Sequence, residues 1–116
     1  MKPISPRPIT TEEQAVLCQT LTRVALHPEA QTHLAELPDL QVVGICGCGC
    51  GSLYFHPDPG DRLIADGWAD FPNGKEANVM LWTYDGCLSY LEIVDWERAG
   101  GLPDQKTIRT HEERWP

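Results

Sequence analysis

Residues 79–94 constrain the fold more strongly than any other part of the chain. Two runs rich in large apolar, aromatic and β-branched residues, VMLWTY and CLSYLEIV, flank the dipeptide Asp85-Gly86. Because Asp-Gly between such runs is a favoured two-residue type I′ turn, this segment predicts a β-hairpin. In the register of that turn, Trp82 is expected to face Ser89 across the two strands.

Two helices are predicted before the strand-rich half. Thr10, with Glu13 three residues later, has the form of a capping box, and apolar residues then recur at helical spacing up to Leu26. Pro28 ends this helix and opens a shorter one, which ends before Pro38.

Further strand candidates lie on the N-terminal side of the hairpin. The apolar period changes to two over residues 40–56, and residues 62–71 have strand-like composition between two turns. Helices followed by antiparallel strands, without β-α-β alternation, predict an α+β fold. We expect two N-terminal helices packed on one face of a three- to four-stranded antiparallel sheet.

The length predicts one domain covering residues 1–116, since 116 residues are enough for one core but not for two. Three prolines favour an extended arm over residues 1–9, and the polar composition favours a loosely held tail over residues 104–116. Trp115 is the one candidate in this tail for docking on the domain.

Charge and hydropathy exclude several classes of function. The net charge of −8 argues against nucleic acid as a partner, because phosphates would repel such a surface. No stretch approaches the ~20 apolar residues of a membrane span, and the first residues lack the apolar core of a secretory signal. We therefore expect no membrane association, and a cytoplasmic location. The acidic residues concentrate between residues 57 and 104, which fits either simple solubility or a basic partner.

The most unusual motif is the alternating run of cysteine and glycine from Cys46 to Gly51. Read as a strand, it places Cys46, Cys48 and Cys50 on one face and the glycines on the other, where they would leave a groove for a helix. Simple packing, a metal site and thiol chemistry all remain open for these cysteines. A zinc shell would need a fourth ligand, and the candidates are His56, Cys87 and Cys18.

No catalytic constellation is recognisable in the sequence. It has no phosphate-binding loop, dinucleotide fingerprint, HExxH motif or nucleophile elbow. Nothing places any of the four histidines beside a nucleophile. We therefore predict a protein that is not an enzyme, with no catalytic residues, no cofactor and no assigned metal.

The chain resembles a group of small bacterial proteins in which a CGCG-type run precedes a strand of the form DG-x-L-x-x-LE-[IV] and an LP turn. The matching segments are Cys46 to Gly51, Asp85 to Ile93, and Leu102-Pro103. The resemblance covers about residues 40–103. In size, acidity and α+β layout this group is similar to the immunity proteins of bacterial toxin systems, which bind a cognate toxin and block it.

This resemblance implies a binding protein that neutralises a cognate basic toxin domain, with a metal- or thiol-binding protein using the cysteine run as the alternative. Aromatic anchors ringed by charge are typical of tight protein interfaces. The predicted partner-binding residues are Asp66, Trp68, Asp70, Glu92, Asp95, Trp96 and Glu97.

Overall fold

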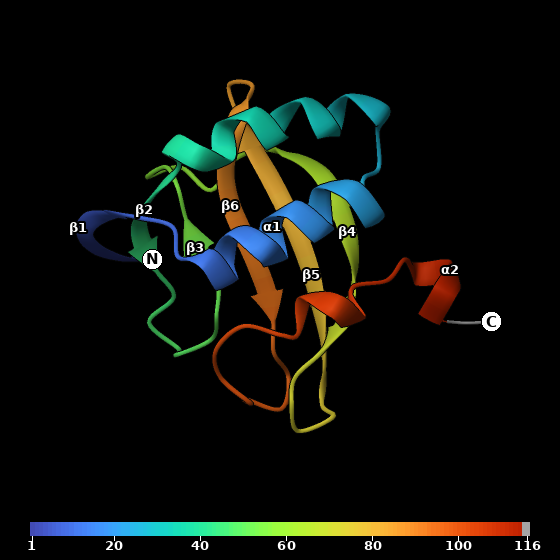
Figure 1. Cartoon of the computed structure of the whole chain (residues 1–116). Coiled ribbons are helices and arrows are strands. Elements are labelled where there is room, and N and C mark those ends of the chain that lie inside the picture. Colours follow the sequence, from blue (N-terminus) through green and yellow to red (C-terminus); the bar gives the residue numbers. More distant parts are fainter. Residues whose placement is uncertain (115–116) are drawn as a thin grey trace.

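A computed structural model describes residues 1–114 of the chain and shows an α+β fold built on one antiparallel sheet (Figure 1). Six strands form the sheet in the order β1-β2-β3-β6-β5-β4. The strands are β1 (Lys2–Pro8), β2 (Gln41–Ile45), β3 (Leu53–Tyr54), β4 (Arg62–Asp70), β5 (Glu76–Tyr84) and β6 (Cys87–Val94).

The α+β class is confirmed, but the predicted layout of two helices on a three- to four-stranded sheet is wrong. The helical elements before β2 are one α-helix, α1 (Thr11–Arg23), and one 3-10 helix, η1 (Pro28–Asp39). Short helical turns follow the sheet at η2 (Gln105–Thr107) and α2 (His111–Arg114).

The N-terminal segment expected as an extended arm is an edge strand. β1 pairs with β2, and its register shifts between Pro3 and Arg7. Proline removes a ladder hydrogen bond, so it is tolerated on an edge strand with an irregular register. The sequence therefore signalled extended backbone here, but it did not signal pairing.

The hairpin of β5 and β6 is confirmed, with one difference in register. Asp85 and Gly86 have φ angles of 51° and 80°, as a type I′ turn requires. An irregularity between Trp82 and Thr83 then shifts the pairing by one residue, so that Trp82 faces Tyr90 instead of Ser89. As a result Trp82 and Tyr90 share one face of the sheet.

Both longer helical elements lie on one face of the sheet (Figure 1). The first has the predicted capping box, in which Thr10 accepts from the backbone N–H of Glu13 and the Glu13 carboxylate accepts from that of Thr10. Leu17 and Leu21 of α1 are fully buried, as are Leu81 of β5 and Leu91 of β6. The core thus lies between the helices and the inner face of the sheet.

The C-terminal segment up to Arg114 is held against the sheet, which differs from the loose tail expected. The backbone of Arg109 exchanges two hydrogen bonds of 2.9 Å with that of Trp68 on β4, and Ile108 is only 1% exposed. The last two residues of the expected tail, including Trp115, lie outside the described residues. Among residues 1–114, no helix is long and apolar enough to cross a membrane.

We expect Glu13 to make the free energy of unfolding depend on pH in the acidic range. Glu13 is 6% exposed, and burial alone would raise the pKa of its carboxyl, but hydrogen bonds from Arg7 and from the Thr10 backbone lower the pKa overall. A group with a lowered pKa in the folded state stabilises the fold above its ordinary pKa, and this contribution is lost as the pH falls through the lowered value. Glu13→Gln should therefore cost about 1–3 kcal/mol of unfolding free energy at pH 7.

Chemical unfolding at several pH values measures this effect. The gap between wild type and Glu13→Gln should narrow as the pH falls below about 4.5, the ordinary pKa of a glutamate. Glu12→Gln, an exposed position in the same helical turn, is the matched control. A gap that stays constant down to pH 3 would contradict the prediction.

Candidate functional site

The face of the sheet opposite the two longer helices carries a row of aromatic side chains. We call it the outer face. Tyr54, Tyr90 and Trp82 are direct neighbours across β3, β6 and β5, and all three are partly exposed. The rings of Tyr54 and Tyr90 stack with centroids 4.2 Å apart. Burial raises the pKa of the Tyr90 hydroxyl above its usual range.

Two of the predicted binding residues meet at the end of the outer face. Trp68 of β4 and Trp96, which follows β6, stack with ring centroids 5.8 Å apart and an interplanar angle of 24°. Trp96 is 64% exposed, although it is a large apolar side chain. The Arg114 guanidinium lies 3.7 Å from the centroid of the Trp68 ring, and this distance is within the range of a cation–π contact.

The turn that carries Trp96 is held in place by a carboxylate. Asp95 accepts hydrogen bonds from the backbone N–H groups of Ala99 and Gly100 at 2.9 and 2.8 Å. This cap closes the turn around Trp96 by hydrogen bonds from two backbone N–H groups to the Asp95 side chain. The exposed indole is therefore presented from a defined loop, which lowers the entropy that a partner would have to remove on binding.

The other predicted acidic residues are paired within the chain. Asp66 contacts His111, Asp70 contacts Arg109, Glu97 contacts Lys75 and Glu92 accepts from the indole N–H of Trp82. The predicted set is thus assembled around the outer face and its rim, but it is less negative than the sequence indicated, because Arg109 and Lys75 lie among its carboxylates.

Sequence reasoning missed the residues that the C-terminal segment adds to this surface. Arg109 and Arg114 both bind Glu76, and their guanidinium groups lie 2.7 and 2.8 Å from its carboxylate. The hydrogen bond from Arg114 is the main cause that lowers the pKa of Glu76. The place of Glu76 on this surface could have been predicted, because side chains alternate along β5 and Glu76 lies on the same face as Trp82. The two arginines carried no such signal in an irregular segment.

The cysteine–glycine run is a loop, and the interpretation as a strand is wrong. β2 ends at Ile45, and the following residues form a turn in which Gly49 has a φ of 88°. We call residues 46–51 the thiol loop. Alternation of small residues is compatible with a strand, but glycine also permits the left-handed backbone that this turn uses. The glycine groove expected for a helix is therefore absent from this loop.

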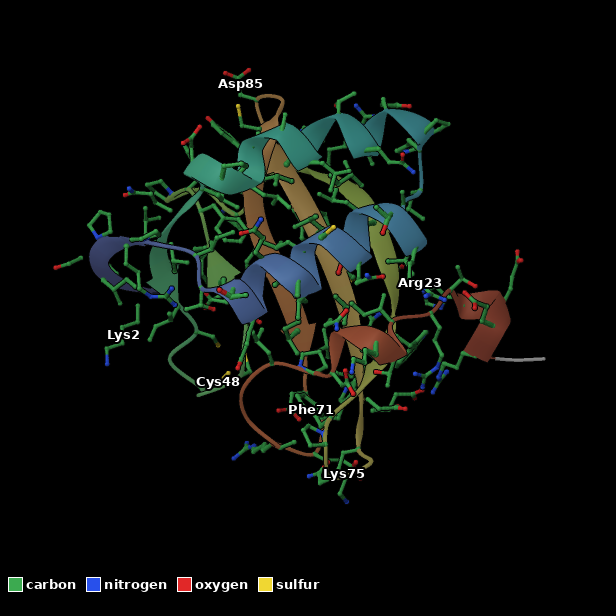
Figure 2. The ribbon with its side chains drawn as sticks, in the orientation of Figure 1. Lys2, Arg23, Cys48, Phe71, Lys75 and Asp85 are labelled. Atoms are coloured by element: carbon green, nitrogen blue, oxygen red, sulfur yellow. The ribbon has the colours of Figure 1, made fainter. Side chains whose placement is uncertain are left out.

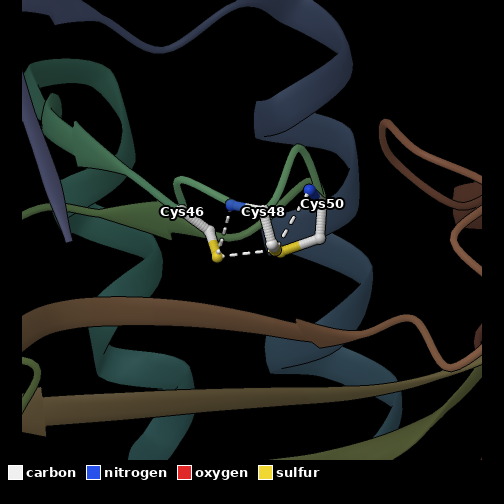
Figure 3. A group of neighbouring side chains, drawn as sticks. All are labelled: Cys46, Cys48 and Cys50. Atoms are coloured by element: carbon white, nitrogen blue, oxygen red, sulfur yellow. Dashed lines mark hydrogen bonds between the residues drawn. The ribbon is translucent and has the colours of Figure 1, made fainter.

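The loop gathers the three sulfur atoms that a strand would have spread apart (Figure 3). The Sγ atoms of Cys46, Cys48 and Cys50 all lie within 4.8 Å of one another, and those of Cys46 and Cys48 are 2.7 Å apart. The backbone N–H groups of Cys48 and Cys50 each donate to the sulfur of the cysteine two residues earlier, at 3.4 Å. Figure 2 shows Cys48 far from the hairpin turn at Asp85.

Contacts among the thiols give Cys46 and Cys48 different pKa values. The hydrogen bond with Cys46 lowers the pKa of the exposed Cys48 thiol to about 7, and the same contact raises the pKa of Cys46 to about 11. A thiol with a lowered pKa carries more thiolate, the form that binds metals and reacts as a nucleophile.

No fourth ligand joins this cluster in the described part of the chain. Within residues 1–114, the three cysteines form the one group of three or more histidine, cysteine or acidic side chains whose donor atoms converge to this extent. The candidates from the sequence, His56, Cys87 and Cys18, do not belong to it. His56 instead stacks on Tyr84, with ring centroids 4.6 Å apart.

Comparisons of the chain with protein-family models, with curated proteins and with solved structures gave no match.

Proposed function

We propose that this chain is a non-enzymatic binding protein that docks a partner protein on the outer face of its sheet, as an immunity protein docks its toxin. The observation that carries the proposal is the stacked pair of Trp68 and Trp96, with Trp96 64% exposed. The resemblance of residues 40–103 to the group similar to immunity proteins supplies the class of partner.

The chemistry of this surface is that of a protein interface. Tryptophan, tyrosine and arginine are the residues most enriched among those that dominate binding energy. Trp68, Trp96, Tyr90 and Arg114 supply all three types on the outer face and at its rim. Their surroundings are polar, as at the rim of a typical interface.

A basic partner fits the remaining charge. The five predicted carboxylates and Glu76 outnumber the cations paired with them, Arg109, Arg114 and Lys75, by three. The whole chain carries a net charge of −8. Opposite charge speeds association and favours partners with a basic surface. We therefore assign the docking surface to a basic toxin domain, which this chain would cover.

The test uses the product of the gene beside the one that encodes this chain. A basic toxin domain encoded there should bind the purified chain, and co-expression should protect cells from it. Trp96→Ala should weaken binding by about 2–4 kcal/mol, or roughly 30- to 1000-fold in Kd, because it removes the most exposed aromatic anchor. Calorimetry measures the affinity, and the association rate should fall as the salt concentration rises.

Leu26→Ala is the matched control, because Leu26 is also apolar and is 48% exposed, but it lies between α1 and η1 at the edge of β4 and not among the outer-face aromatic side chains. Trp96→Ala should change the unfolding free energy by less than about 1 kcal/mol, since Trp96 is mostly exposed. Equal affinities for wild type and Trp96→Ala would reject the proposed surface. A neighbouring toxin domain that neither binds nor is neutralised would reject the proposed function.

A further inference from the structure

The thiol loop has no role in the surface proposed above, and its geometry is not explained by packing. Cys48 is exposed and Cys46 and Cys50 are only half-buried, so these side chains do not fill the core. Gly47 and Gly49 have open space where a side chain would begin. The loop nevertheless turns all three sulfurs towards one point (Figure 3).

We propose that Cys46, Cys48 and Cys50 form a three-thiolate site for Cu(I). Thiolates are soft ligands and select Cu(I) and Zn²⁺ over hard cations such as Mg²⁺ and Ca²⁺. Structural zinc sites are almost always four-coordinate, and no fourth ligand converges with these three within residues 1–114. The donor set therefore fits the monovalent soft ion better than the divalent one.

The distances need only a small adjustment to hold one ion. A thiolate sulfur lies about 2.3 Å from a bound first-row ion such as zinc, so three sulfurs around one ion of similar size are about 4 Å apart. The three Sγ atoms already lie within 4.8 Å of one another. The pair at 2.7 Å must open by about 1 Å, and the exposed position of the Cys48 side chain allows this movement.

The surroundings of the loop favour negatively charged sulfur. The two backbone N–H groups that donate to Cys46 and Cys48 stabilise thiolates, as outer-shell donors do in metal sites. Arg98 and Asp95 line a cavity of about 100 Å³ together with Cys48 and Cys50, so the two opposite charges beside these sulfurs balance each other. In the metal-free protein Ser52, which is itself bound to β6, accepts from the Cys50 thiol at 3.2 Å, and this bond ends when Cys50 loses its proton to bind Cu(I).

The experiment is an anaerobic titration of the fully reduced chain with Cu(I), in competition with a chromophoric Cu(I) chelator of known affinity. We expect one Cu(I) per chain, thiolate-to-copper charge-transfer absorption, and three sulfur neighbours of copper in X-ray absorption. Substitution of Cys46, Cys48 or Cys50 by serine should weaken binding by about 100-fold or more, since loss of an outer-shell partner alone costs about 10- to 100-fold.

Cys18→Ser and Cys87→Ser are the matched controls, because both remove a free thiol outside the cluster, and they should bind Cu(I) as wild type does. Thermal unfolding checks that each variant is folded. Absence of Cu(I) binding by a folded chain with five reactive thiols would overturn the proposal. So would a site that binds Zn²⁺ more tightly than Cu(I), or Cu(I) binding that survives loss of the three loop cysteines.

Discussion

Ile108→Ala should lower the free energy of unfolding by about 2–5 kcal/mol, the usual cost of truncating a buried isoleucine. Ile108 is 1% exposed and belongs to the main core cluster. It lies between two contacts that hold the C-terminal segment: Asp104 donates its backbone N–H to the Asp70 carbonyl at 2.7 Å, and Arg109 pairs with Trp68. Truncation would leave a cavity that these contacts prevent from collapsing.

Denaturant unfolding followed by circular dichroism measures this change. Lys106→Ala is the matched control, because Lys106 is exposed in the same segment, and its effect should stay within about 0.5 kcal/mol. If the two variants were equally stable, the C-terminal segment would be a loose tail after all. A loss confined to Ile108→Ala would show that the core extends to this segment.

The elements predicted best are those in which a local signal and the tertiary environment agree. The capping box of Thr10 and Glu13 and the Asp85-Gly86 turn each depend on neighbouring residues only, and both are present as expected. The register beyond the turn was not predictable, because the irregularity at Trp82 arises within the strand pair and has no local sequence signal.

The errors in the strand count arise where pairing depends on distant residues. Lys2–Pro8 reads as an arm because of its prolines, and only the presence of β2 beside it makes it a strand.

The segment around Ile108 has too few apolar residues to show any period, so its burial could not be inferred.

In the candidate sites too, features with a local sequence signal were predicted, and features without one were not. Alternation placed Asp66, Trp68 and Asp70 correctly on one strand, and the structure adds that Trp68 meets Trp96. The convergence of the three thiols was hidden, because alternating glycine is compatible with both a strand and a turn. The loop also contacts residues that lie fifty positions later in the chain, and the local sequence does not signal this contact.

That contact is between Gly51 and Gly101, and it predicts the last effect. A side chain added at Gly51 would lie 2.3 Å from the Gly101 carbonyl oxygen and 2.7 Å from its carbon, which are backbone atoms that cannot turn aside. Gly51→Ala should therefore cost about 1–3 kcal/mol of unfolding free energy, as is typical of overpacking. Gly47→Ala is the matched control in the same loop, because an added Cβ there meets nothing within 4 Å.

The effect of Gly51→Ala should reach both proposed sites. Cys50 forms a backbone β-bridge with Gly101, and Gly101 directly follows the turn that carries Trp96. We expect the Gly51→Ala chain to bind Cu(I) more weakly than Gly47→Ala, and to show altered near-ultraviolet circular dichroism from the Trp68–Trp96 pair. Unfolding curves, Cu(I) competition and the dichroism spectrum measure the three effects on the same samples. If Gly51→Ala and Gly47→Ala behaved alike in all three, the thiol loop would not be packed against the turn that carries Trp96.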